Sequence, residues 1–204
     1  MSTVSTDASQ TIYIVDDDPA VRDALSVVFE MEGFTVVSFA DGDSFVEAAQ
    51  TRIPACVILD VHMPGRSGID VLKALSADNY AAPIFIISGQ GDIPMAVDAI
   101  RNGAFDFIEK PFNADTVVER VREGIAAMSN RAGSVDDHPD FQGADLLTRR
   151  EREVLGKITA GASNKEAGRD LGISPRTVEV HRARIMEKLG AKNAADLVRI
   201  VLGH

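Results

Sequence analysis

The stretch IYIVDDDPAVR, from Ile12 to Arg22, decides how the first part of this chain folds. Its apolar beginning predicts a short strand that is buried on both faces. Three adjacent carboxylates follow, Asp16, Asp17 and Asp18, and they repel one another unless a cation, a protonation or a helix start compensates. Aspartate before proline is typical of an N-cap with proline in the first helical turn. The stretch therefore predicts a strand, a polar strand end and a helix, in that order.

Four further apolar runs alternate with segments of helical periodicity. The sequence predicts strands at 11–15, 34–39, 55–61, 83–88 and 105–110, and helices at about 19–32, 42–51, 67–77, 93–102 and 113–127. Several of these runs are continuously apolar, as in parallel strands that are covered on both faces. After a tail of residues 1–10, residues 11–128 are thus expected to form an α/β domain with a five-stranded parallel, doubly wound sheet in the order 2-1-3-4-5.

The charge of the chain is divided along its length. Residues 1–128 carry 20 Asp and Glu against 8 Lys and Arg, whereas residues 145–204 carry 12 Lys and Arg against 8 Asp and Glu. Binding to a polyanion is therefore plausible only for the second part. The sequence has no apolar run near the roughly 20 residues of a membrane span and no signal-peptide pattern, so we expect a cytoplasmic protein without a membrane partner. The single cysteine, Cys56, lies in an apolar run and is expected to be buried.

The second part of the chain predicts a small all-α domain. Residues 129–145 are rich in Gly, Ser and Asp and predict a linker. In residues 146–204, Thr148 and Glu151 have the spacing of a capping box, and further helices are expected at 164–171, 175–189 with Ser174 as N-cap, and 193 to about 202. The turn DLGIS between the second and third of these four helices indicates a helix-turn-helix.

Polar side chains at the ends of the predicted strands form a candidate site. In a doubly wound sheet, Asp16 and Asp17 after strand 1, Asp60 after strand 3, Ser88 after strand 4 and Lys110 after strand 5 converge on one crevice. Clustered carboxylates favour a hard cation such as Mg²⁺. A carboxylate can also act as the nucleophile that accepts a phosphoryl group, and Asp60 is the best-placed candidate. Lys110 and Ser88 would then supply a charge and a hydroxyl to phosphate oxygens.

Each of these residues also has an ordinary structural interpretation. We favour Asp18 as the N-cap of the first helix over Asp18 as a metal ligand. Ser88 alone would be a turn residue, and Lys110 alone a solvated charge. The combination of these residues at strand ends favours the functional interpretation.

The motifs VDDD (15–18), LDVHMPG (59–65), IISG (86–89) and FIEKPF (107–112) resemble the signature set of a two-component response-regulator receiver domain. The resemblance covers nearly all of residues 11–128. It implies that Asp60 is the phosphoacceptor, that Asp17 and Asp16 hold Mg²⁺ with Asp60, and that His62 contributes its backbone carbonyl.

The resemblance also implies a switch. Ser88 and Phe107 match the hydroxyl and aromatic positions that reorient on phosphorylation in this family. For Phe107, packing in the core is the alternative interpretation. A doubly charged phosphoryl group on Asp60 would gain charge-assisted hydrogen bonds from Ser88 and Lys110 in only one of two conformations. Phosphorylation would therefore favour that conformation of the domain surface.

The stretches LTRREREVL, GASNKEAGRDLGIS and RTVEVHRARIMEKLGAKN resemble the output domain of the LuxR and FixJ class, so that the whole chain is similar to a FixJ-type response regulator. The resemblance places DNA contacts on the second and third helices. We expect them at Lys165, Arg176, Thr177, Glu179, Val180, His181, Arg182, Ala183, Arg184 and Lys188, with packing as the alternative for His181. Many relatives have Lys at the position of Glu179, which leaves the base preference open, since glutamate can accept from cytosine. Helical spacing assigns Val178, Ile185 and Leu189 to the core.

These features predict a DNA-binding transcription regulator that is controlled by phosphorylation. The expected partners are a sensor histidine kinase, double-stranded promoter DNA, a second copy of the chain after phosphorylation, and RNA polymerase. An Mg²⁺-dependent phosphohydrolase is an alternative, but His62 stands where such enzymes carry a second carboxylate, so we expect no turnover of external substrates. A DNA-binding regulator whose receiver no longer accepts phosphate is the other alternative.

Overall fold

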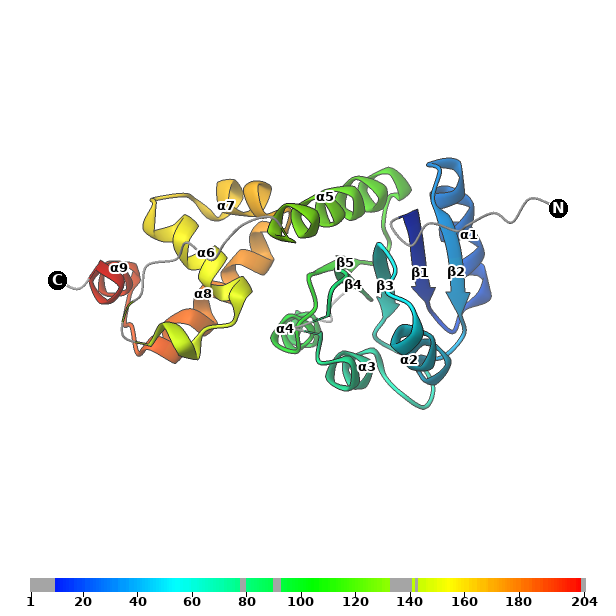
Figure 1. The fold of residues 1–204 in the computed structure, drawn as a ribbon, viewed down its shortest axis with the longest axis horizontal. Coiled ribbons are helices and arrows are strands. Elements are labelled where there is room, and N and C mark those ends of the chain that lie inside the picture. Colours follow the sequence, from blue (N-terminus) through cyan, green and yellow to red (C-terminus); the bar gives the residue numbers. More distant parts are fainter. Residues whose placement is uncertain (1–9, 78–79, 90–92, 133–140, 142, 203–204) are drawn as a thin grey trace. The chain divides into compact units, whose positions relative to one another are not determined.

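A parallel sheet of five strands forms the centre of the first part of the chain (Figure 1). The strands are β1 (Thr11–Val15), β2 (Thr35–Phe39), β3 (Cys56–Asp60), β4 (Ile84–Ser88) and β5 (Asp106–Glu109). Their order is β2-β1-β3-β4-β5, which confirms the predicted topology. Strands β1, β3 and β4 are buried along their whole length, and Cys56 lies buried in β3 as expected.

Helices cover the sheet in the pattern of a doubly wound fold. They are α1 (Pro19–Met31), α2 (Gly42–Thr51), α3 (Gly68–Leu75), α4 (Ile93–Arg101) and α5 (Ala114–Ala132). Helix α3 packs between α2 and α4, and Figure 1 shows these three helices in a row. The Asp18 side chain accepts a hydrogen bond of 2.8 Å from the Ala20 amide, with Pro19 in the first turn, which confirms Asp18 as the N-cap of α1.

The computed structural model describes residues 10–77, 80–89, 93–132, 141 and 143–202. The chain divides into two compact units, Met1–Met128 and Ser129–His204. Helix α5 continues to Ala132, beyond the predicted end at 127, so the first residues of the predicted linker are helical. Most of the N-terminal tail and residues 133–140 and 142 of the linker lie outside the described residues. Among the described helices, none combines the length and the apolar character needed to cross a bilayer.

The second unit contains a helix-turn-helix. A short 3-10 helix, η3 (Ala144–Leu146), precedes α6 (Arg149–Thr159), α7 (Asn164–Leu171), α8 (Pro175–Leu189) and α9 (Ala194–Leu202). The capping box of Thr148 and Glu151 and the N-cap Ser174 are confirmed. Val178 and Ile185 are completely buried, as predicted, but Leu189 is only half-buried.

A glycine allows the turn between α7 and α8 to fold back closely. The Ile173 amide donates to the Gly168 carbonyl at 2.9 Å, and a Cβ on Gly168 would lie 2.6 Å from the Ile173 carbonyl oxygen. That oxygen belongs to the backbone and cannot move aside without opening the turn. Gly156, in α6 of the same unit, has no atom within 4 Å of the corresponding position.

We therefore expect opposite effects from two identical substitutions. Gly168→Ala should lower the free energy of unfolding of the second unit by about 1–3 kcal/mol, because it overpacks the turn. Gly156→Ala should raise it by up to about 1 kcal/mol, because alanine favours the helix. Urea unfolding followed by circular dichroism measures both changes. The chain has no tryptophan, and both tyrosines lie in the first unit, so tyrosine fluorescence should report an unchanged unfolding transition of that unit. Equal effects of the two substitutions would contradict the close approach at Gly168.

Candidate functional site

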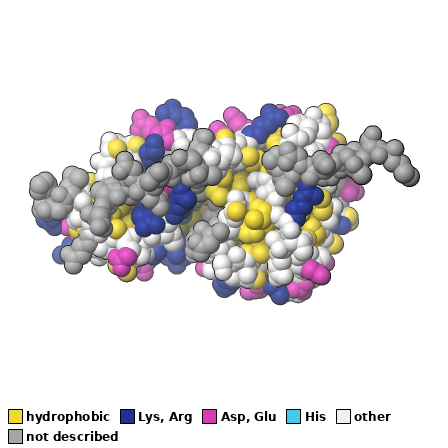
Figure 2. Space-filling model, viewed as in Figure 1, with side chains coloured by type: hydrophobic (Ala, Val, Ile, Leu, Met, Phe, Trp, Pro, Cys, Tyr) yellow, Lys and Arg dark blue, Asp and Glu magenta, His cyan; other side chains and the backbone are white. Residues whose placement is uncertain are grey.

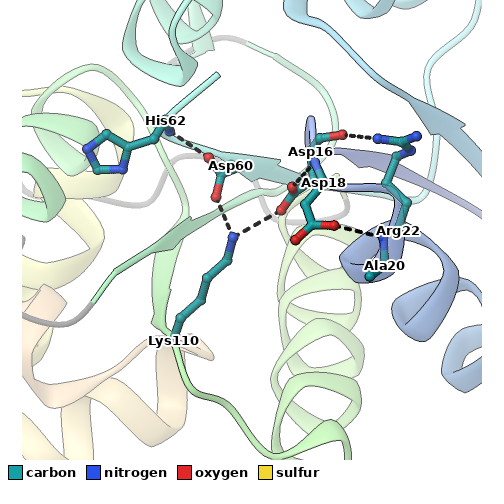
Figure 3. A network of polar contacts seen from close by, with 7 residues as sticks. All are labelled: Asp16, Asp18, Ala20, Arg22, Asp60, His62 and Lys110. Carbon is teal, nitrogen blue, oxygen red and sulfur yellow. Dashed lines mark hydrogen bonds and ion pairs between the residues drawn. The ribbon is translucent and has the colours of Figure 1, made fainter. Parts of the chain in front are cut away.

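The Lys110 ammonium joins two carboxylates that come from different strands. Its Nζ atom lies 2.7 Å from Oδ1 of Asp60 and 3.1 Å from Oδ2 of Asp16 (Figure 3). Asp16 follows β1, Asp60 ends β3 and Lys110 follows β5. The parallel order of the strands brings their carboxyl ends to one edge of the sheet, which is where the sequence predicts the site.

Asp60 lies in a confined position. The residue is 4% exposed, and the amide of His62 donates to its Oδ2 at 2.6 Å. Burial raises the pKa of the Asp60 carboxyl above its ordinary value, and the Asp16 charge adds to this, although the hydrogen bond and charge of Lys110 oppose the shift. Burial alone would lower the pKa of Lys110, but the two carboxylates raise it above the ordinary value. The pocket therefore holds an ammonium group that favours its charged form and a buried carboxyl group whose charged form is only partly stabilised by Lys110.

The loop after β1 holds Asp16 from three directions. Its Oδ1 accepts from the Asp18 amide at 2.9 Å, and its main-chain carbonyl accepts from Nη1 of Arg22 at 2.6 Å. Its Oδ2 is the atom that faces Lys110. The sequence analysis did not identify Arg22. The signal for it is weak, because an arginine in the first turns of a helix usually reaches solvent.

The other predicted residues of the pocket differ in exposure. Asp17 is exposed, and so is His62, whose imidazole points away from Asp60 in Figure 3. Ser88 is buried, and its carbonyl accepts from the Lys110 amide at 2.7 Å, which fixes the lysine beside β4. Phe107 is also buried, at 8% exposure, so its ring packs in the core in this structure.

The oxygen donors of the pocket suit a hard cation, although the described residues contain no ready group of three His, Cys, Asp or Glu placed to hold a metal ion. The candidate ligands are the carboxylates of Asp16, Asp17 and Asp60 and the His62 carbonyl, an all-oxygen set of the kind that Mg²⁺ prefers. One lysine faces two of these carboxylates, and burial, together with the Asp16 charge, raises the pKa of Asp60 although Lys110 opposes the shift. The donor chemistry therefore fits Mg²⁺.

A further buried ion pair lies at the start of β5, the end of the strand away from the pocket, and was not predicted. Asp106, at the start of β5, is completely buried and pairs with Arg120 of α5. The Asp106 carboxylate also accepts from the Phe107 amide. The only sequence signal is a charge in an apolar run, which does not name its partner.

Helices α7 and α8 present part of the predicted DNA-contact set to solvent. Lys165, Glu179 and Ala183 are exposed, and Val180 and Arg182 are partly exposed. Arg176 is also partly exposed. Figure 2 shows Lys and Arg side chains spread over the face of the helical unit that is in view. These residues form a candidate nucleic-acid surface.

Other members of the predicted contact set lie against the protein itself. Thr177 and His181 are buried, at 0% and 3% exposure, so their side chains pack inside the unit. Packing was the alternative interpretation that the sequence offered for His181. Lys188 Nζ lies 2.7 Å from Oε2 of Glu151, and Arg184 Nε lies 3.5 Å from its Oε1. Glu151 is completely buried, so these two basic residues neutralise it and join α8 to α6.

Comparison with protein families agrees with both halves of this description. Residues 12–122 match the response regulator receiver domain, and residues 145–201 match the bacterial regulatory proteins of the luxR family. The match boundaries enclose the carboxylate pocket and the helix-turn-helix, respectively.

Known proteins are similar over nearly the full chain. The transcriptional regulatory protein FixJ of Bradyrhizobium diazoefficiens is 40% identical over 94% of both chains. The C4-dicarboxylate transport transcriptional regulatory protein DctR of Rhodobacter capsulatus is 38% identical over 94% of this chain and 99% of its own. The crystal structure of full-length FixJ from B. japonicum matches with a TM-score of 0.59 and 40% identity over 95% of this chain and 96% of that one. The chain therefore belongs to the FixJ-type response regulators of two-component systems, with a receiver domain and a luxR-family DNA-binding domain.

Proposed function

We propose that this transcription regulator is switched by a phosphoryl group on Asp60. The observation that carries the proposal is the position of Lys110, whose ammonium faces both Asp60 and Asp16 at the edge of the sheet. An ammonium group in that position can pair with the carboxylates before the transfer and with the phosphoryl oxygens after it, without leaving the pocket. The phosphodonor would be a phosphorylated histidine of a sensor kinase.

The transfer needs a nucleophile, a leaving group and compensation of charge. A carboxylate oxygen of Asp60 attacks phosphorus, the new O–P bond forms as the N–P bond breaks, and the imidazole nitrogen leaves with the electron pair. Lys110 stabilises the negative charge on the phosphoryl oxygens, and the His62 amide, which now donates to Asp60, is placed to hold a carboxylate oxygen.

Mg²⁺ is the expected cofactor of this step. Asp16, Asp17, Asp60 and the His62 carbonyl would hold it, and the ion would neutralise charge on the carboxylates and on the incoming phosphoryl group. The need for it follows from the charges, because a single lysine cannot balance several carboxylates and a dianion.

The switch would act through the residues next to the pocket. A phosphoryl group on Asp60 offers Ser88 and Lys110 strong acceptors, and both residues belong to the β4–β5 edge of the sheet. A shift of Ser88 with the ring of Phe107 would alter the surface of α4 and β5, on which a second copy could pair. We propose pairing of two copies as the step that brings two output units onto adjacent half-sites of DNA.

The output unit would bind DNA through α8 in the major groove. We propose Lys165, Arg176 and Arg182 for the phosphate backbone, and Glu179, Val180 and Ala183 for base edges. Arg184 and Lys188 support α8 through Glu151, so any contact that they make with DNA competes with that buried pair. Thr177 and His181 are left out of the proposed contact set, because their side chains are buried.

Phosphorylation should strengthen binding to DNA only when Asp60 is present. With a small phosphodonor such as acetyl phosphate and Mg²⁺, the full chain should take up one phosphoryl group and bind a sequence selected from random duplex DNA more tightly. Asp60→Asn should take up none, because an amide is a poor nucleophile, and should bind DNA equally with and without the donor. Intact mass and electrophoretic mobility shifts measure the two effects. If Asp60→Asn responded to the donor as the parent does, the proposal would be wrong.

Two adjacent carboxylates should behave differently in the same assay. Asp17→Asn should slow uptake of the phosphoryl group at least tenfold at limiting Mg²⁺, because it removes a proposed metal ligand. Asp18→Asn should leave the rate nearly unchanged, because asparagine caps a helix about as well as aspartate. Both variants lose one charge, so each is the control for the other. Equal rates in the two variants would contradict the proposed division of roles.

A further inference from the structure

Asn164 connects the two helices of the helix-turn-helix through its side chain. It is the first residue of α7, yet its amide group reaches two residues in the middle of α8. Its Nδ2 donates to Oε1 of Glu179 at 3.2 Å, and its Oδ1 accepts from Nη1 of Arg182 at 2.8 Å. Only one orientation of the amide suits both partners, because a carboxylate needs a donor and a guanidinium needs an acceptor.

The helix start does not need the side chain of Asn164. Ser163 is the N-cap of α7, its hydroxyl accepts from the Glu166 amide, and the Glu166 carboxylate accepts from the Ser163 amide in return. This capping box satisfies the first turn without Asn164. The amide is therefore free to act on α8, and its two contacts there are its role in the structure.

Asn164 also changes which contact Glu179 and Arg182 make. The two residues are three positions apart on α8, a spacing at which opposite charges usually attract each other. In the described part of the chain they form no ion pair with each other, and each contacts the Asn164 amide instead. A direct pair would occupy the carboxylate and the guanidinium. The neutral amide between them orients both groups and leaves their remaining donor and acceptor capacity for another molecule.

We infer that Asn164 is a positioning residue for DNA recognition, holding the Glu179 carboxylate ready to accept from a base amino group in the major groove and the Arg182 guanidinium ready for a phosphate. This inference rests on the proposed DNA-binding role of α8. The recognised feature is an exocyclic amino group, for which glutamate selects cytosine. Asn164 itself does not touch the base.

Four single variants and one double variant of the full chain test the inference. Each is phosphorylated with acetyl phosphate and Mg²⁺, and its affinity is measured for the duplex sequence that the parent enriches from a random pool and for every single base-pair change in it. Glu179→Ala identifies the base pair that Glu179 reads. Asn164→Ala should reduce discrimination at that same base pair, by roughly 3- to 10-fold, because Glu179 and Arg182 can then pair directly. In the Glu179→Ala background, Asn164→Ala should cause no further loss there.

Asn164→Asp separates positioning from folding. Aspartate keeps the acceptor for Arg182 and favours a helix N-terminus, but it replaces the donor to Glu179 by a like charge. It should therefore fold normally and still lose discrimination at the base pair read by Glu179. Lys165→Ala is the control for a simple loss of phosphate contact. It should weaken binding to all sequences equally and leave discrimination unchanged.

The outcomes distinguish this inference from the proposed function. If the parent enriches no sequence, the DNA-binding role of α8 fails, and the inference fails with it. If the parent enriches a sequence but Asn164→Asp and Asn164→Ala discriminate as the parent does, the positioning role of Asn164 is wrong and the proposed function stands. Loss of discrimination at base pairs that Glu179→Ala leaves unaffected would also overturn it.

Discussion

The receiver site depends on one ammonium group shared by two buried carboxylates. Lys110, Asp16 and Asp60 come from three strands that are far apart in sequence, and only the order β2-β1-β3-β4-β5 brings their ends together. The ammonium offsets part of the cost of burying Asp16 and Asp60, but burial and the Asp16 charge still raise the pKa of Asp60 above its ordinary value. An additional positive charge near Asp16 and Asp60 would therefore stabilise the charged forms of both carboxylates. In the proposed mechanism, a phosphoryl group on Asp60 and a hard cation would change this balance of charge and with it the conformation of the sheet edge.

The output unit also contains a buried carboxylate that is compensated by basic side chains, but here the pairing joins two helices. Glu151 is completely buried, caps its own helix with Thr148, and is neutralised by Arg184 and Lys188 of α8. Removing both Arg184 and Lys188 would leave the buried Glu151 charge uncompensated, so this pair of residues helps to fix the position of α8. Helix α8 is therefore held to α6 through Glu151, whereas on its exposed side Asn164 contacts Glu179 and Arg182.

Much of the fold and of the receiver site follows from local sequence signals. Apolar runs with polar ends predict the strands and the crevice, and Asp18 with Pro19 predicts the start of α1, because each signal acts between neighbours in the chain. Contacts between distant segments were harder to foresee. The pairs of Asp106 with Arg120 and of Glu151 with Lys188, and the burial of Thr177, depend on how helices pack, which a charge pattern alone does not specify. The end of α5 was missed because residues 129–132 have no helix-breaking residue.

The most direct test of the account is to locate the phosphoryl group chemically. The full chain is treated with acetyl phosphate and Mg²⁺, and any acyl phosphate is then reduced with borohydride, which converts the aspartate to homoserine. Peptide mass spectrometry identifies the residue. The account predicts homoserine at position 60 and nowhere else. Homoserine at Asp16 or Asp17, or a stable phosphate on Ser88 with Asp60 unmodified, would contradict it.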